Sequence, residues 1–291
     1  MKPAPFEYHL VRSVVEAVTM LGELDDAKLL AGGQSLMPMM NMRFVSPAHV
    51  IDINGISGLA ELRVTGDRLT VGALARQATL LQSELVSRCC PLIGYALCHT
   101  GHVQTRSRGT IGGSLCHLDP AAELPVVALT LGATLTVQGP SGQREVSFVD
   151  WPLMYMTPAL SPDEMLVAVS FPLRQRRQGD AFVEFSRRRG DFAVACVGCS
   201  MQLDDMGAIS SVAIALGGVG ATVLRLGEAE ALLRGRRPAL PLFSEAAAFV
   251  ERIESSSDAY FTASYRTSLA KALIAQALGI AAERALHPEA P

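Results

Sequence analysis

Two glycine-rich runs contain the residues of this 291-residue chain that are best suited to bind a ligand. The first is Gly32-Gly-Gln-Ser35, which follows the short apolar stretch 28–31, and the second is Thr110-Ile-Gly-Gly-Ser114. Glycine permits positive φ angles and leaves the backbone uncovered, so successive N–H groups can point at one anion. Serine and threonine hydroxyls in both runs add further donors. The pattern therefore predicts binding of a diphosphate group.

Neither run alone identifies the ligand. A Gly-Gly pair after a strand is often only a tight turn, and neither run matches the GxGxxG dinucleotide fingerprint or the GxxxxGK[ST] phosphate loop. A third cluster, Gly217-Gly-Val-Gly220, is interpreted as a turn before the C-terminal helices. The two runs thus indicate phosphate binding by loops of another kind.

The six cysteines match no disulfide framework, zinc pattern or iron–sulfur set; they are Cys89, Cys90, Cys98, Cys116, Cys196 and Cys199. The last two form a CxxC pair inside the apolar run 192–201, which predicts a strand. Positions three apart on a strand face opposite sides, so we interpret both as buried small residues. Hydrogen-bonding or capping roles are expected for His102 and His117, which flank the second run. No residue is predicted to bind a metal or to act as a catalytic acid, base or nucleophile.

Composition predicts a packed globular protein rather than a nucleic-acid or membrane protein. Apolar residues make up 49% and charged residues 18%, with a net charge of −3. Basic residues form no long stripe and aromatic residues are only 5%, which disfavours a protein that stacks bases. No stretch of about 20 apolar residues predicts a membrane span, and the N-terminal residues lack a secretory signal. A cytoplasmic, reducing location is therefore expected.

Strands and helices are intermixed without regular βαβ alternation, which predicts an α+β fold. The capping box Ser13-Val-Val-Glu16 predicts a first helix, and Gly-containing turns predict hairpins over 62–71 and 133–148. The stretch 173–180 has no apolar period, so we interpret it as a boundary between domains. Beyond it, three strand-like runs precede a helical tail, and they cover 181–187, 192–203 and 209–216.

Four segments occur in order along the chain: two contain the glycine runs and two lie in the C-terminal half. The first is Ala31-Gly-Gly-Gln-Ser-Leu36, followed by Val50-Ile-Asp-Ile53. The second run stands in Gly101-His-Val-Gln-Thr-Arg-Ser-Arg-Gly-Thr-Ile-Gly-Gly-Ser114, and the C-terminal half carries 184–193 and 215–219. Together these segments resemble the FAD-binding (medium) subunits of the molybdenum hydroxylase family, which includes carbon monoxide dehydrogenase medium subunits and xanthine dehydrogenase FAD subunits. The resemblance covers nearly the whole chain.

The resemblance implies a fold in two domains. Residues 1–175 are expected to form a vanillyl-alcohol-oxidase (PCMH) type FAD-binding domain with α+β subdomains of about 1–56 and 57–175. Residues 176–291 are expected to form a C-terminal domain of the carbon monoxide dehydrogenase flavoprotein type. That domain should contain a three-stranded sheet and helices.

The resemblance also implies an oxidoreductase subunit that transfers electrons. Non-covalently bound FAD is expected to accept electrons from [2Fe–2S] clusters on a small subunit and to pass them to an external acceptor. The substrate would be oxidised at a molybdenum–pterin cofactor on a large subunit. The expected assembly is a dimer of such heterotrimers, a heterohexamer. Carbon monoxide, N-heterocycles and aldehydes all remain open as substrates.

Carried over residue by residue, the resemblance places FAD against both runs and a few residues outside them. Residues 31–35 and 110–114 would hold the diphosphate, Glu123 would accept ribose hydroxyls, and Leu166 would pack against the flavin. Asp191 could equally stand near the isoalloxazine ring or cap a turn. The predicted cofactor-binding residues are Leu30, Ala31, Gly32, Gly33, Gln34, Ser35, Leu36, Thr100, Gly101, Thr110, Ile111, Gly112, Gly113, Ser114, Glu123, Leu166 and Asp191.

Two positions depart from the carbon monoxide dehydrogenase subunit, which has His where this chain has Gln34 and Asp where it has Ser114. These differences bear on the environment of the flavin ring and on the electron acceptor. Two alternatives share the fold: a free-standing FAD oxidoreductase with its own substrate, and a scaffold subunit that has lost the flavin. The first needs a catalytic acid or base near the ring, and the second predicts damaged glycine runs, whereas both runs are intact.

Overall fold

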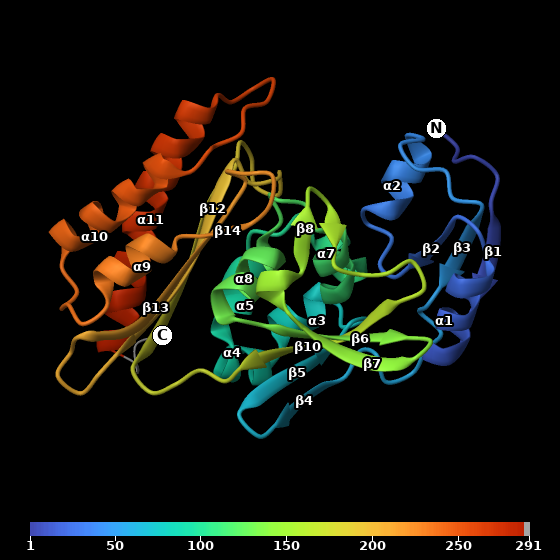
Figure 1. Ribbon diagram of the computed structural model, residues 1–291, viewed down its shortest axis with the longest axis horizontal. Helices are drawn as coiled ribbons and strands as arrows, with labels where there is room; N and C mark the ends of the chain where they lie inside the picture. The colour runs from blue at the N-terminus through green and yellow to red at the C-terminus, as the bar shows by residue number, and fades with distance from the viewer. Residues whose placement is uncertain (288–291) are drawn as a thin grey trace.

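The computed structural model describes residues 1–287, which form three units arranged in a row (Figure 1). The N-terminal unit lies at one end, a larger central unit in the middle and the C-terminal unit at the other end. Residues 288–291 of the predicted C-terminal domain lie outside the described residues. Each unit contains both helices and strands, as expected for an α+β fold.

The N-terminal unit is a three-stranded parallel sheet in the order β1-β3-β2, with α1 packed on one face. The predicted cap forms at the start of α1, with the Glu16 carboxylate reaching back to the residue before the N-cap Ser13. Glu16 N donates to Ser13 Oγ at 3.1 Å, and Glu16 Oε2 accepts from Arg12 N at 2.8 Å. The elements of this unit are β1 (Glu7–Leu10), α1 (Val14–Glu23), β2 (Ala27–Leu30), α2 (Leu36–Asn41) and β3 (His49–Asp52).

The central unit is a five-stranded antiparallel sheet in the order β4-β5-β10-β6-β7, whose buried face packs against helices. Along β6, buried Leu135 and Val137 alternate with half-buried residues, as a strand with one covered face requires. The sheet strands are β4 (Leu62–Thr65), β5 (Arg68–Gly72), β6 (Thr134–Gly139), β7 (Gly142–Ser147) and β10 (Met165–Pro172). The helices are α3 (Gln77–Gln82), α4 (Glu84–Cys89), α5 (Pro91–Leu97), α6 (Val103–Arg108), α7 (Ile111–His117) and α8 (Glu123–Leu131). A 3-10 turn (Phe148–Asp150) leads to the small hairpin β8 (Pro152–Met154) and β9 (Thr157–Pro158).

The second glycine run is not a loop, as the sequence suggested, but the first turn of α7. Glycine disfavours helix by about 1 kcal/mol per residue, so local propensity does not account for this helix. Contacts with the chain after β5 stabilise it instead: Ile111 N donates to Ala75 O at 3.1 Å, and Gly112 N donates to Ala73 O at 2.9 Å. Thr110 caps the helix by accepting from the N–H of Gly113 at 3.0 Å.

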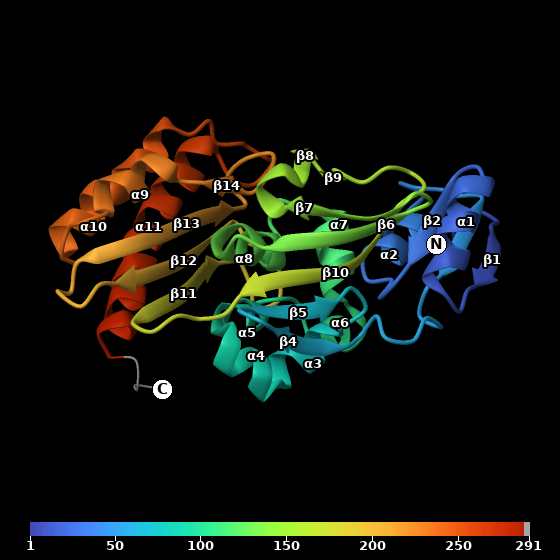
Figure 2. The same cartoon turned by 60° about the horizontal axis from the view of Figure 1, so that its bottom comes forward.

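The C-terminal unit is a four-stranded antiparallel sheet in the order β11-β12-β13-β14. Three long strands were expected, and the two-residue strand β14 extends the sheet by one. Helices α9, α10 and α11 cover one face, and α8 of the central unit lies against the other (Figure 2). The elements are β11 (Gln178–Phe185), β12 (Ala195–Leu203), β13 (Ile209–Gly217), β14 (Leu224–Arg225), α9 (Gly227–Leu233), α10 (Leu240–Ala247), a 3-10 turn (Ala248–Arg252) and α11 (Ala263–Leu286).

Both faces of this sheet are buried, and the CxxC pair lies across it. Cys196 faces the core of the central unit, whereas Cys199 faces the core beneath α9–α11. Burial raises the pKa of both thiols far above the ordinary value. The interpretation of the pair as buried small residues is therefore confirmed. Gly198, between them, lets α8 come close, because a Cβ there would lie 2.5 Å from Thr130 Oγ1.

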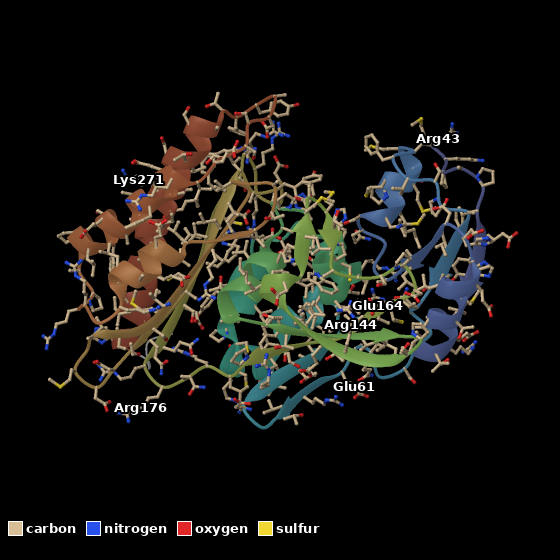
Figure 3. All side chains as sticks on the ribbon, viewed as in Figure 1. Arg43, Glu61, Arg144, Glu164, Arg176 and Lys271 are labelled. Atoms are coloured by element: carbon tan, nitrogen blue, oxygen red, sulfur yellow. The ribbon has the colours of Figure 1, made fainter. Side chains whose placement is uncertain are left out.

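A bidentate ion pair fixes β7 to the segment that enters β10. Arg144 Nε and Nη2 donate to the two carboxylate oxygens of Glu164 at 2.7 and 2.6 Å, and Figure 3 shows the two side chains meeting. The hydrogen bonds from Arg144 hold the pKa of Glu164 at about 2.

Among residues 1–287, no helix is long and apolar enough to cross a bilayer.

Replacing Trp151 with Phe should destabilise the protein, because Trp151 supports α7. Its indole Nε1 is buried and donates to Leu115 O in α7 at 2.7 Å. The change removes this bond and part of a fully buried ring, so we expect the free energy of unfolding to fall by about 2–3 kcal/mol in urea titrations. Val149→Ala, at an exposed site nearby, should cost less than about 0.5 kcal/mol. An equally small loss for Trp151→Phe would show that this contact does not support α7.

Candidate functional site

The first glycine run presents three successive backbone donors. It begins where β2 ends, turns at Gly33 with φ of +70°, and leads into α2. From Met37 onward the N–H groups are used within the helix, starting with a bond from Met37 N to Gly33 O at 3.2 Å. Within residues 1–287, the N–H groups of Gly33, Gln34 and Ser35 have no hydrogen-bond acceptor. Such a run of free donors suits a diphosphate.

The first run lies in direct contact with Arg108 and Gly109, which directly precede the second run although they are more than 70 residues away in the chain. A Cβ at Gly32 would lie 2.3 Å from Arg108 O, so only glycine fits here. Asn54 Nδ2 donates to Ala31 O at 2.8 Å, and Arg76 donates both to Asn54 Oδ1 at 2.6 Å and to Arg108 O. Asn54 and Arg76 thus join the runs. Sequence analysis missed both, since neither stands in a glycine-rich run.

The second run differs from the prediction that its amides bind phosphate. The N–H groups of residues 111 and 112 bond Ala75 and Ala73, and those of Gly113 and Ser114 bond Thr110. What it offers to a ligand is hydroxyls: no described residue bonds the Ser114 hydroxyl. Gly113 is exposed, whereas Gly112 is buried against Ala73, where a Cβ would lie 2.6 Å from the carbonyl oxygen. The second run therefore forms mainly a rigid wall of the candidate site.

Charges around the contact favour an anion. Burial, and then the charge of Arg108, lowers the pKa of Arg76, so two positive groups act on the same place. The nearby carboxylate is Asp52. Burial alone would raise its pKa, but hydrogen bonds from Tyr8 and Asn54 outweigh burial and hold the pKa below the ordinary value. Two cations against one carboxylate leave a net positive charge beside the free amides.

A second group of predicted residues meets at the ends of α5 and α8. Arg106 Nη1 donates to Thr100 O at 2.7 Å and to Gly101 O at 3.0 Å, which fixes the turn before α6. Glu123 is the first residue of α8 and only 7% exposed. Burial raises its pKa to about 7, against the opposing effect of hydrogen bonds that include the Thr100 hydroxyl. The structure thus brings Thr100, Gly101 and Glu123 together.

The C-terminal unit adds a carboxyl group that sequence analysis missed. Glu184 on β11 has its pKa raised to about 8, first by burial and then by the charge of Glu123. Its Oε2 is buried and has no hydrogen-bond partner in the described part of the chain. A protonated carboxyl group can donate to or accept from a ligand hydroxyl. Two carboxyl groups, one from each side of the domain boundary, therefore face the same region.

The remaining predicted residues lie in different surroundings. Asp191 stands in the connection between β11 and β12 and pairs with Arg187 at 3.9 Å. This connection approaches the segment before the second run, because a Cβ at Gly190 would lie 2.5 Å from His102 Cε1. Leu166 is only 4% exposed and packs in the core of the central unit, as does Ile111. Direct contact of Leu166 and Ile111 with the cofactor stays a prediction.

Two family models match successive parts of the chain. Residues 4–174 match the FAD binding domain in molybdopterin dehydrogenase, and residues 180–281 match the CO dehydrogenase flavoprotein C-terminal domain. The first match alone covers more than half of the 291 residues. The two matches follow the order of units in the structure.

Relatives of known activity match over nearly their full length. The 6-hydroxypseudooxynicotine dehydrogenase complex subunit alpha of Paenarthrobacter nicotinovorans is 37% identical, covering 98% of this chain and 97% of the relative. The caffeine dehydrogenase subunit beta of a Pseudomonas species is 36% identical, covering 99% and 98%. In the carbon monoxide dehydrogenase structure from Hydrogenophaga pseudoflava, one chain superposes with a TM-score of 0.95 at 36% identity, covering 98% and 99%.

These matches confirm the predicted fold and the predicted cofactor, FAD. The intact first run, with its free amides, agrees with both and gives no support to a scaffold without flavin. The relatives are subunits or medium chains of multi-subunit oxidoreductases. The chain belongs to the FAD-binding medium subunits of the molybdenum hydroxylase family.

Proposed function

We propose that Gly33, Gln34 and Ser35 hold the FAD diphosphate through their backbone N–H groups. The observation that carries this proposal is the lack of any acceptor for these three donors within residues 1–287. Gly33 and Ser35 are half-buried and Gln34 is exposed, so a ligand can reach all three amides, and a diphosphate satisfies them at once. Thr110 and Ser114 contribute hydroxyl groups from the opposite wall. The surrounding positive charge stabilises the anion.

The second group of residues receives the sugar hydroxyls. Glu123 accepts from the adenosine ribose, and Thr100 and Gly101 line the same side of the site. Glu184 approaches the same side from the C-terminal unit. Both domains, proposed as residues 1–175 and 176–291, therefore contribute to one cofactor site, and the first domain divides into subdomains of about 1–56 and 57–175.

The subunit acts as the electron outlet of a larger complex. Bound FAD supplies the redox chemistry, because a flavin accepts electrons singly and releases them in pairs. Electrons enter from [2Fe–2S] clusters on a small subunit, and the substrate is oxidised at molybdenum–pterin on a large subunit. Relatives named for caffeine, nicotine and carbon monoxide are all similar to this chain, which supports a role in electron transfer rather than substrate selection. The proposed complex is a dimer of heterotrimers, and its FAD passes electrons to an external acceptor.

Gly33→Ala should weaken flavin binding while the fold is kept. A Cβ at Gly33 would meet only the flexible side chains of Leu30 and Met37 at 3.2 Å, but the positive φ would shift and turn the donors away. We expect FAD affinity to fall at least about 10-fold, the effect of losing one or more charge-assisted hydrogen bonds. The measurement is the flavin absorption of the purified chain and the FAD released on denaturation.

Gly66→Ala is the matched control. Gly66 also has a positive φ, +60°, and a Cβ there would meet nothing within 4 Å, so the backbone strain is similar but lies far from the runs. This variant should keep its FAD. If both variants retain stoichiometric FAD, the first run does not bind the diphosphate; if both lose it, strain alone explains the loss.

Glu184→Gln should change how stability depends on pH. The ordinary glutamate pKa is 4.5, whereas Glu184 titrates at about 8. Between these values the unfolded chain has lost the proton that the folded chain retains, so stability is greatest below about pH 4.5 and falls as pH rises to about 8. The variant should therefore gain stability over wild type across this range. Urea titrations at several pH values measure it, with exposed Glu145→Gln as control. A difference that stays constant with pH would rule out a buried, titrating Glu184.

A further inference from the structure

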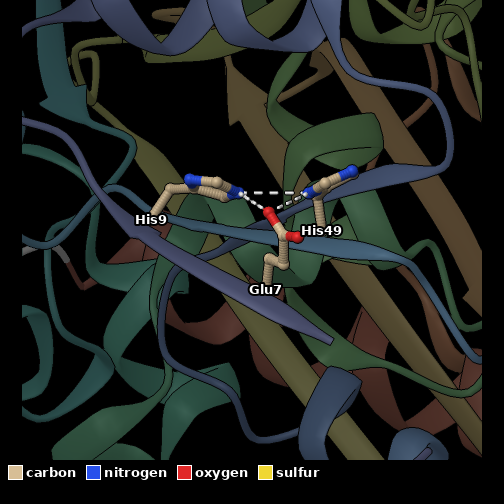
Figure 4. A group of neighbouring side chains, drawn as sticks. All are labelled: Glu7, His9 and His49. Carbon is tan, nitrogen blue, oxygen red and sulfur yellow. Dashed lines mark hydrogen bonds and ion pairs between the residues drawn. The ribbon is translucent and has the colours of Figure 1, made fainter. Parts of the chain in front are cut away.

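Three side chains with metal-binding atoms converge on the N-terminal unit, away from the glycine runs. Figure 4 shows Glu7, His9 and His49 pointing toward one another. His9 Nε2 lies 3.1 Å from His49 Nδ1, and Glu7 Oε2 lies 3.9 Å from the first nitrogen and 3.6 Å from the second. Among residues 1–287, it is the one group of three such ligand atoms close enough to share an ion.

The strand register produces this arrangement. Glu7 and His9 are two residues apart on β1, so they lie on the same face of the sheet. His49 is the first residue of the neighbouring parallel strand β3 and stands directly beside Glu7. Both histidines are about one-fifth exposed, whereas the Glu7 side chain is 74% exposed. The cluster thus has two largely buried imidazoles and one exposed carboxylate at the rim.

The spacing suits a small transition-metal ion. A point equidistant from the three atoms lies about 2.1 Å from each, which is the usual length of a bond from Zn²⁺ to imidazole nitrogen or carboxylate oxygen. A small outward movement of the exposed Glu7 carboxylate would make room for tetrahedral geometry. Two imidazoles and a carboxylate are also a ligand set that zinc accepts, with water in the fourth position.

We propose that Glu7, His9 and His49 form a binding site for a divalent transition-metal ion of the zinc class. A hydrogen bond between the two imidazoles accounts for the 3.1 Å contact without a metal, but it does not account for the carboxylate beside both nitrogens. Glu7 has no ion-pair partner among residues 1–287 other than these two rings. A bound cation satisfies all three atoms at once.

The site would tie the edge strand β1 to the central strand β3. It is separate from the flavin site, because His49 begins β3 whereas Asp52, beside the first glycine run, ends it. The outer nitrogens of both rings have no hydrogen-bond partner in residues 1–287. Hydrogen-bond partners on these outer nitrogens typically strengthen metal binding 10- to 100-fold, so we expect this site to bind more weakly than one whose rings have such partners.

The test is titration of the tag-free, FAD-loaded full chain with Zn²⁺ by calorimetry, and with Co²⁺ by visible spectroscopy. We expect one equivalent to bind, with the absorption of a nitrogen- and oxygen-ligated Co²⁺. Binding should also raise the unfolding temperature of the chain.

Variants decide which residues bind. His49→Gln and His9→Gln should each weaken Zn²⁺ binding at least about 30-fold, and Glu7→Gln should weaken it less, since the carboxylate is exposed. His287→Ala removes an exposed histidine elsewhere and should change nothing. The proposal is overturned if the wild-type chain binds no Zn²⁺ in the calorimetric titration. It is equally overturned if the double variant His9→Gln/His49→Gln, folded and loaded with FAD, binds as wild type does.

Discussion

The backbone of Gly32 lies so close to the carbonyl of Arg108 that no side chain fits between them, and the candidate site depends on this contact. It joins the N-terminal unit to the central unit at the point where the first glycine run leaves β2. Asn54 and Arg76 bond around it and fix its geometry. Because a Cβ at Gly32 would push the two units apart, one glycine sets the distance between the free amides and the opposite wall of the site.

The two glycine runs look alike in sequence but have different structural roles. The first follows a strand end, where the chain leaves the sheet, so its amides remain unpaired. The second begins a helix that is packed against Ala73 and Ala75, so its amides are already bonded within the protein. One wall is therefore rigid and the other carries the donors. This preorganisation lowers the ordering cost when an anion binds.

Local patterns in the sequence predicted the parts of the fold that local interactions determine. The N-cap at Ser13, the hairpins and the opposite orientation of Cys196 and Cys199 all follow from periodicity and turn chemistry. The helical state of the second run was missed because tertiary hydrogen bonds override the low helix propensity of its glycines. Arg76 and Glu184 were missed because they reach their sites from separate elements, and spacing along the chain carries no signal of such encounters.

The carboxyl pair links cofactor binding to the docking of the C-terminal unit. Glu123 belongs to the central unit and Glu184 to the C-terminal unit; burial raises the pKa of both, and the charge of Glu123 raises that of Glu184 further. Any ligand that donates hydrogen bonds to these carboxyl groups relieves part of the cost of burying them. A ligand that binds only when both units are in place also stabilises their contact by mass action, and the coupling is reciprocal. The sheet that presents Glu184 is buried on both faces, so the backbone that carries this carboxyl group is fixed between the two cores.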